Sequence, residues 1–276
     1  MAECGFDSHP TLEKLLSRKR GRKLLNMAWI TAITLIILWY TKSLYLEETN
    51  WDRIGGWAGM ITMLLRYLPP DVTTFPDLIE PAIETLMIAF LGTLLAAFFS
   101  LPTVWLAARN ITPLFPASYS VGRLLIIVSR SVHEIVWALL FVTAFGLGSL
   151  TGIIAIAFRS FGFLSKLVAE AIEDIDPRSL EGIKATGANR LQVIHFGVLP
   201  QIMPIFIGNL IFLLDINIRR STILGMVGAG GLGLVLRDEM FQFNFGGATT
   251  VLLVIVVIVA TGEMLSLLTR KAITKT

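Results

Sequence analysis

Apolar runs that are close in length to a lipid bilayer's thickness dominate this sequence of 276 residues. A helix needs roughly 20 mainly apolar residues to cross the hydrocarbon layer. Backbone polar groups in lipid must be satisfied within the segment, so the runs are expected to be helices. Hydrophobic residues make up 54% of the chain and charged residues 16%, whereas soluble domains are roughly 45–50% apolar. The sequence therefore predicts an all-α integral membrane protein with about six spans, at residues 24–40, 78–101, 121–145, 150–168, 201–218 and 248–268.

The basic residues lie beside these runs and indicate their orientation. With the N-terminus in the cytoplasm, 13 lysine and arginine residues fall on the predicted inner segments (1–23, 102–122, 169–199 and 269–276) and 6 on the outer ones (41–77, 146–149 and 219–247). Lysine and arginine are enriched in the cytoplasmic loops of membrane proteins. We therefore expect both termini inside the cell, and we interpret the net charge of +3 as a topology signal rather than a nucleic-acid-binding surface.

The first 77 residues are predicted to form a leader, a span and a surface helix. Residues 1–23 are a polar leader with a single cysteine, Cys4, which cannot form an internal disulfide or a cysteine-based metal site. Residues 24–77 begin with a span that no small-residue cleavage site follows, so it is expected to remain as an anchor. An amphipathic helix follows, either on the outer membrane surface or as an extracellular lid. Its apolar positions are Trp51, Ile54, Trp57, Ile61, Leu64 and Leu68.

The longest predicted cytoplasmic loop, residues 170–200, has the signals of two short helices joined by a turn. Asp176 is suited to cap the first helix, with Pro177 at its first position, where a missing N–H carries no cost. Gly187 is suited to end that helix in a left-handed conformation, and Asn189 to cap the second. One face of each helix has no lipid to cover it, which predicts a docking partner. These faces contain Leu180, Ile183, Lys184 and Gly187 in the first helix, and Leu191, Ile194 and Val198 in the second.

This loop resembles the EAA loop of ABC importer permeases, whose pattern is E-A-A, three residues, G, nine residues, I-x-L-P. The positions that match at the right spacing are Glu181, Gly187, Leu199 and Pro200. Gly182 and Ile183 stand in place of the two alanines, and Gly197 in place of the isoleucine. The resemblance implies that the loop inserts as a coupling helix into a separate ATPase subunit. The residues expected at that contact are Leu180, Glu181, Ile183, Lys184, Gly187, Ala188, Leu199 and Pro200.

Three longer strings resemble the permeases of phosphonate importers in particular. They begin at Ser131, Glu181 and Gly225 and end at Gly148, Asn189 and Gly233. The resemblance covers roughly residues 75–270 and implies that residues 78–276 form a permease core of the type I importer fold. It implies two permease copies, two ATPase subunits that hold ATP and magnesium, and an extracytoplasmic protein that delivers phosphonate, phosphite or phosphate. The implied location is the plasma membrane of a prokaryote, which is the inner membrane of a Gram-negative cell.

A glycine-rich string near residue 230 satisfies the dinucleotide-binding pattern G-x-G-x-x-G without its usual context. That pattern binds phosphates when a strand precedes it in a βαβ unit, and no strand is predicted here. The chain also has no G-x-x-x-x-G-K-[ST] segment, so no cofactor is expected in this chain and ATP chemistry is expected in the partner subunit. We interpret the glycines as an irregular segment near the outer mouth of the bundle. A gate is the functional hypothesis for Gly228, Gly230, Gly231 and Gly233.

Ionisable side chains within or beside the spans need an explanation, because each costs roughly 2.5–3.5 kcal/mol at a helix centre on insertion scales. Arg130 with Glu134, and Asp215 with Arg219, are four residues apart and can pair along their own helices. Arg159 has no acidic residue three or four positions away, so its partner is expected on another helix, in water or on a passing anion. The residues predicted to line a translocation pathway are Arg130, His133, Glu134, Arg159, Asp215 and Arg219.

Other functions remain open from the sequence. An intramembrane enzyme would use His133, Glu134 and a serine such as Ser129 or Ser131, although no nucleophile motif accompanies them. A membrane receptor or scaffold would use the same loop to bind a soluble partner without transport. Within the importer class, a permease for methionine or another small solute is the nearest alternative, because the coupling loop does not report the cargo.

Overall fold

The computed structural model describes residues 10–44, 56–112 and 115–274, and every regular element in these ranges is helical. The all-α prediction is therefore confirmed. The chain divides into two units, Met1–Leu64 and Leu65–Thr276. In the first unit, α1 (Pro10–Lys42) contains the first predicted span and extends it backwards through part of the charged leader. Its apolar side chains between Leu25 and Tyr40 are exposed, as expected for a helix whose solvent is lipid.

The predicted amphipathic helix appears as α2 (Gly56–Arg66), in which no residue is buried. Trp57, Ile61 and Leu64 are all exposed on it. Trp51 and Ile54, like Cys4, lie outside the described residues. The choice between a membrane-surface helix and an extracellular lid stays a prediction.

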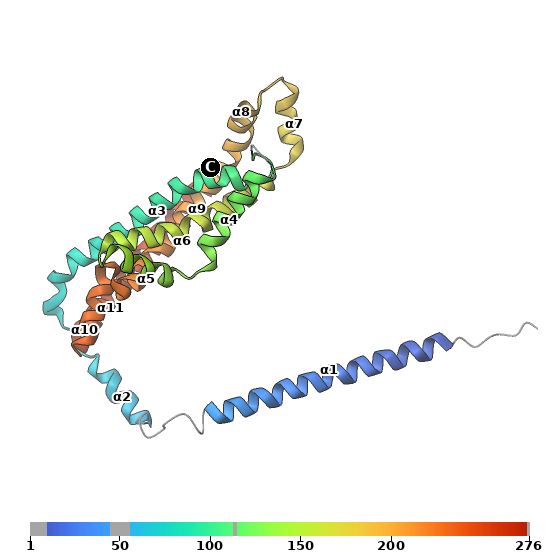
Figure 1. Cartoon of the computed structure of the whole chain (residues 1–276). Coiled ribbons are helices and arrows are strands. Elements are labelled where there is room, and N and C mark those ends of the chain that lie inside the picture. Colours follow the sequence, from blue (N-terminus) through green and yellow to red (C-terminus); the bar gives the residue numbers. More distant parts are fainter. Residues whose placement is uncertain (1–9, 45–55, 113–114, 275–276) are drawn as a thin grey trace, which may run out of the picture. The chain divides into compact units, whose positions relative to one another are not determined.

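The second unit holds a helical bundle with a projecting loop at one end (Figure 1). Helices α3, α6 and α9 lie side by side, α7 and α8 project from one end of the bundle, and α10 lies at the opposite end. The elements of this unit, in chain order, are η3 (Val72–Leu78), α3 (Ile79–Ala107), α4 (Ala117–Ser131), α5 (Glu134–Phe145), α6 (Ser149–Glu173), α7 (Pro177–Ala185), α8 (Arg190–Val193), η4 (Ile194–Val198), α9 (Leu199–Leu224), η5 (Gly225–Ala229), α10 (Gly231–Phe241) and α11 (Phe245–Thr274).

Five helical stretches in the described part of the chain are long and apolar enough to cross a membrane, and α4 with α5 forms a sixth if the bent pair is one span. This agrees with the prediction of about six spans. The continuous helix predicted over residues 121–145 is wrong, because Val132 and His133 have extended backbone and the two helices meet at 91°. Irregular backbone at membrane depth is tolerated only inside protein or beside a water-filled cavity. The break therefore marks a place that lipid does not line.

Small residues bring the bundle helices into close contact. A Cβ on Gly92 of α3 would lie 2.7 Å from Ile156 Cγ2 of α6, and a Cβ on Gly122 of α4 would lie 2.6 Å from the backbone nitrogen of Ala107. In lipid, van der Waals packing of such close helices is a main source of association. The largest buried cluster joins α3, α4, α6 and α9 through residues such as Ala96, Ile126, Leu164 and Leu213.

Candidate functional site

The coupling loop has the local structure that its sequence predicts. The Asp176 carboxylate accepts a hydrogen bond of 2.9 Å from the backbone N–H two residues further on, and Pro177 is the first residue of α7. Gly187 ends the turn with φ of +83°. Asn189 and Gln192 form a reciprocal capping box at the start of α8, with hydrogen bonds of 2.9 and 2.8 Å. The two helix starts and the left-handed glycine are therefore confirmed.

Helix α7 is held against the segment that follows α8. An ideal Cβ on Gly197 would lie 2.9 Å from both Ile183 Cδ1 and Leu180 Cδ2, so these two side chains rest directly over the glycine backbone. The two departures from the EAA pattern at positions 183 and 197 therefore compensate each other. Ile183 supplies a larger side chain on α7, and Gly197 leaves room for it because it has no side chain. Gly182, the third departure, faces open space.

The packing within the loop differs from the one predicted. Leu180, Ile183 and Ile194 are half-buried and Val198 is buried, so the loop covers most of the apolar faces that were expected to need a partner. Leu191 and Phe196 remain exposed, by 69% and 66% respectively. We name these two side chains the loop patch. The need for a covering partner therefore falls on the loop patch.

The second helix of the loop is not a separate element. Helix α8 continues through the π-helical turn η4 directly into α9, so the predicted helix-turn-helix is one short helix joined by a turn to the extension of a candidate span. Residues 190–229 form a single helical stretch that is long and apolar enough to cross a membrane. Helix α8 therefore leads into α9 without an intervening loop, and α7 packs on this continuous segment at Gly197.

A polar cluster fastens both ends of the coupling loop to the connector between α3 and α4. Glu173, the last residue of α6, accepts hydrogen bonds from the Arg123 guanidinium at 2.8 Å on both carboxylate oxygens, and from the Arg109 backbone N–H at 2.9 Å. Asn110 donates to the backbone carbonyl of Ile172 at 3.2 Å. At the far end of the loop, Arg190 donates to the carbonyl oxygens of Ile111 and Thr112 at 2.9 and 2.6 Å.

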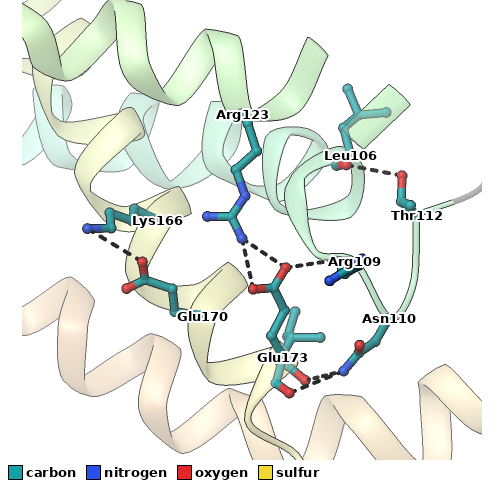
Figure 2. Close-up of polar contacts among 9 residues, drawn as sticks. Leu106, Arg109, Asn110, Thr112, Arg123, Lys166, Glu170 and Glu173 are labelled. Atoms are coloured by element: carbon teal, nitrogen blue, oxygen red, sulfur yellow. Dashed lines mark hydrogen bonds and ion pairs between the residues drawn. The ribbon is translucent and has the colours of Figure 1, made fainter. Parts of the chain in front are cut away.

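Figure 2 shows the α6 half of this cluster, which we name the connector clamp and define as Arg109, Asn110, Arg123, Glu173 and Arg190. The Arg123 side chain reaches from α4 to Glu173, while the Lys166–Glu170 pair nearby stays within α6 at 3.4 Å. The clamp was not predicted, because its members are far apart in the sequence and lie outside any motif. Hydrogen bonds between charged groups, such as those of Arg123 Nη2 with Glu173, are roughly twice as strong as those between neutral groups.

Glu134 is the centre of a second polar cluster, inside the bundle. It begins α5 immediately after the break, and its carboxylate lies 3.2 Å from Arg220 Nε of α9 and 3.7 Å from Arg159 Nε of α6. Of the three partners expected for Arg159, another helix, water or a passing anion, the structure shows the first. The predicted pairing of Glu134 with Arg130 is not formed, because the break between α4 and α5 removes the helical spacing on which it depended.

The other intrahelical pair is present. Arg219 donates to the buried carboxylate of Asp215 along α9, as predicted. Next to them, Asn217 is fully buried and joins Ser160 of α6 to Thr93 of α3, at 3.1 and 2.9 Å. This network satisfies polar groups in the centre of the bundle, which lowers the cost of burying them in a membrane.

The glycine string forms an irregular but fully packed junction. Gly228, Gly230 and Gly231 have positive φ. At the start of α10, the Gly231 N–H donates to the Glu84 carboxylate (2.9 Å), and the next N–H donates to the Thr85 hydroxyl oxygen (2.8 Å). A Cβ on Gly233 would overlap the Thr222 carbonyl oxygen of α9. The close packing predicted for the glycines is confirmed. The N–H groups that would bind a dinucleotide phosphate are already occupied by α3.

The side chains of the alternative enzymatic site have structural partners. Ser129 donates to the Phe158 carbonyl oxygen at 2.6 Å, Ser131 donates within its own helix, and the His133 imidazole accepts from the Ile135 backbone N–H at 3.3 Å. Within the described ranges, no group of three or more histidine, cysteine, aspartate or glutamate residues is arranged to hold a metal ion.

Comparison with known proteins identifies relatives over most of the chain. Residues 89–275 match the family described as binding-protein-dependent transport system inner membrane component. The phosphite transport system permease protein PtxC of Stutzerimonas stutzeri is 35% identical over 250 residues, which cover 91% of this chain and 89% of that protein. The phosphate-import permease protein PhnE of Mycolicibacterium smegmatis is 41% identical over 207 residues, which cover 75% of this chain but only 39% of that longer protein.

A solved structure shares the fold. The inward-facing MetNI methionine ABC transporter matches with a TM-score of 0.64 and 21% sequence identity, over 74% of this chain and 99% of that chain. At this identity the likeness concerns the fold alone. The family match also identifies the chain as a transport component rather than an enzyme, with an ATPase and a binding protein as partners of the family. The chain therefore belongs to the family of ABC importer permeases, the inner-membrane subunits of binding-protein-dependent transport systems, and is related to those of phosphonate, phosphite and phosphate importers.

Proposed function

We propose that this chain is the membrane-spanning subunit of an ATP-driven importer that carries a phosphorus oxyanion into the cell by alternating access. The solute is phosphonate, phosphite or phosphate. The observation that carries the proposal is the 35% identity to a phosphite permease over nearly the full length of both chains. The methionine alternative has weaker support, because the methionine relative with a solved structure is 21% identical.

The assembly that this function requires has four further subunits. A second copy of the chain completes the pathway, two ATPase subunits bind ATP and magnesium, and an extracytoplasmic binding protein delivers the solute. Charge distribution supports cytoplasmic termini and a cytoplasmic coupling loop. This chain needs no cofactor of its own in this scheme.

The coupling loop is the surface on which the ATPase acts. Glu181 and Lys184 are exposed on α7, and the loop patch of Leu191 and Phe196 lies beyond the turn. Exposed apolar side chains in a polar setting suit a protein contact. The ATPase contact proposed here consists of Leu180, Glu181, Ile183, Lys184, Gly187, Ala188, Leu199 and Pro200 together with the loop patch.

The pathway is proposed to follow the broken span and the charged residues around it. Charged groups in a bundle face its interior or water, since lipid exposure is costly. The proposed lining consists of Arg130, His133, Glu134, Arg159, Asp215 and Arg219. The packed glycines Gly228, Gly230, Gly231 and Gly233 are proposed to act as the gate, because α9 and α10 meet there without side chains to separate them.

Transport by the assembled complex tests this function directly. The permease, the ATPase and the binding protein encoded beside it are reconstituted in proteoliposomes, and uptake of methylphosphonate, phosphite, phosphate and methionine is measured with and without ATP. We expect ATP-dependent uptake of at least one phosphorus oxyanion and none of methionine. ATP-dependent uptake of methionine alone, or of no phosphorus oxyanion, contradicts the proposal.

A further inference from the structure

Three arginines and one glutamate form an unbalanced charge cluster within the bundle. Glu134 lies within ion-pair distance of Arg159 and Arg220, and Arg130 is in the last turn of α4, directly before the break. The side chains of Glu134, Arg159 and Arg220 are only 12%, 18% and 20% exposed. Asp215, which lies on the same helix as Arg220, is paired with Arg219. The cluster thus holds more positive charge than its own carboxylate neutralises.

The hydrogen-bond donors of this cluster are also in excess. In the described part of the chain, Arg159 Nε and Nη1 and Arg130 Nε are buried without a hydrogen-bond partner. The contact of Arg159 with Glu134, at 3.7 Å, is an ion pair but is too long for a hydrogen bond. Buried guanidinium groups without partners are costly. An anion with several oxygen atoms satisfies both the charge and the free donors.

The cluster lies next to the break in the span. His133, which lies next to Glu134 in the break, has a side chain that is 65% exposed. Irregular backbone and a polar exposed side chain at this depth face water or protein rather than lipid. The break is therefore the side of the cluster that faces water or protein rather than lipid.

We propose that Arg159 and Arg220 bind an oxyanion during its passage, and that Glu134 is a built-in counter-anion that holds the two guanidinium groups when no solute is present. This inference rests on the proposed function and specifies where the phosphorus oxyanion is recognised. Guanidinium groups bind phosphate-like oxygens through forked hydrogen bonds. Competition from Glu134 keeps the site weak, which a pathway needs because a solute that binds tightly is not released.

Binding by the assembled complex, measured without the binding protein, tests the site. The permease and its ATPase are placed in nanodiscs, and equilibrium dialysis with radiolabelled inorganic phosphate and methylphosphonate measures the apparent affinity. Arg159→Gln and Arg220→Gln are each expected to weaken binding on the order of tenfold, the factor for one hydrogen bond to a charged group. Arg159→Lys keeps the charge and loses the fork, so an intermediate affinity is expected.

The Glu134→Gln variant separates an anion site from a structural ion-pair network. Removal of the competing carboxylate is expected to strengthen anion binding severalfold, whereas a structural role predicts weaker binding. Arg237→Gln is the matched control, since Arg237 also lies beside a carboxylate, at 3.1 Å from Asp238, but on α10 and outside the cluster. Its affinity should equal that of the unmodified complex.

The site and the proposed function can fail separately. If the unmodified complex imports a phosphorus oxyanion while Arg159→Gln and Arg220→Gln bind it with unchanged affinity, the site is wrong and the function stands. A weaker affinity of Glu134→Gln in a complex of normal composition also overturns the site. If the complex binds phosphate with the expected variant pattern but imports no phosphorus oxyanion, the function is wrong and the anion site stands.

Discussion

At the scale of single residues, the contact between Ile183 and Gly197 determines how α7 is held. An ideal Cβ at position 197 would lie 2.9 Å from the Ile183 Cδ1 atom, so the Gly197→Ile substitution, which restores the family pattern at that position, overfills the contact. Overpacking of this kind costs about 1–3 kcal/mol. We predict that Gly197→Ile lowers the melting temperature of the complex and the amount of ATPase that co-purifies with the permease.

The compensating substitution provides the sharper test. Ile183→Ala in the Gly197→Ile background removes one of the two side chains over position 197 and recreates the family pattern at both positions, so ATPase retention should recover in part, since Leu180 Cδ2 still lies there. Gly182→Ala is the control on the same helix, because a Cβ there meets no atom within 4 Å. A Gly197→Ile variant that retains the ATPase normally would show that this contact does not hold the loop.

At the scale of elements, the connector clamp joins α6, α8 and the α3–α4 connector. Glu173→Ala removes the ion pair with Arg123 and the acceptor of the Arg109 N–H. Hydrogen bonds to charged groups contribute about 1.5–3 kcal/mol each. Because the α6 end of the coupling loop loses its attachment to α4 and to the connector, we predict a higher ratio of ATP hydrolysed to solute transported, measured in proteoliposomes, in addition to a lower melting temperature.

The pair of Lys166 and Glu170 is a control for that experiment. It has the same charges and lies on the same helix, but it joins no second element, and its side chains are 39% and 45% exposed. Exposed pairs of this kind contribute roughly 0.3–0.5 kcal/mol. Glu170→Ala should therefore leave both the coupling ratio and the melting temperature unchanged. An unchanged coupling ratio in Glu173→Ala would reduce the clamp to a purely stabilising contact.

At the scale of the whole molecule, the two ends of the bundle are predicted to face opposite sides of the membrane. Glu181 on α7 and Gln242 after α10 are both exposed and lie near opposite ends (Figure 1). In a Cys4→Ser background, Gln242→Cys should react with a membrane-impermeant thiol reagent in spheroplasts. Glu181→Cys should react only after permeabilisation. The reverse labelling pattern would invert the topology and place the coupling loop where no ATPase can reach it.

The sequence by itself determined the features that depend on neighbouring residues. Runs of apolar side chains predicted the spans, and Asp176, Gly187 and Asn189 predicted the ends of the loop helices, because a cap needs only the N–H groups of the next turn. The pairing of Asp215 with Arg219 was likewise readable from their spacing along one helix. The glycine string was correctly interpreted as a place of close packing, since positive φ and small size are properties of the residue itself.

The tertiary structure decided the contacts between residues that are distant in the chain. The bend at Val132 and His133 separates Arg130 from Glu134 and brings Glu134 to Arg159 and Arg220. Glu173 and Arg190 both form hydrogen bonds with a connector that is far from them in the sequence. The large side chain of Ile183 packs against Gly197, which has no side chain. The energies of these contacts depend on distances in space, and helix packing sets those distances, so no pattern along the chain encodes them.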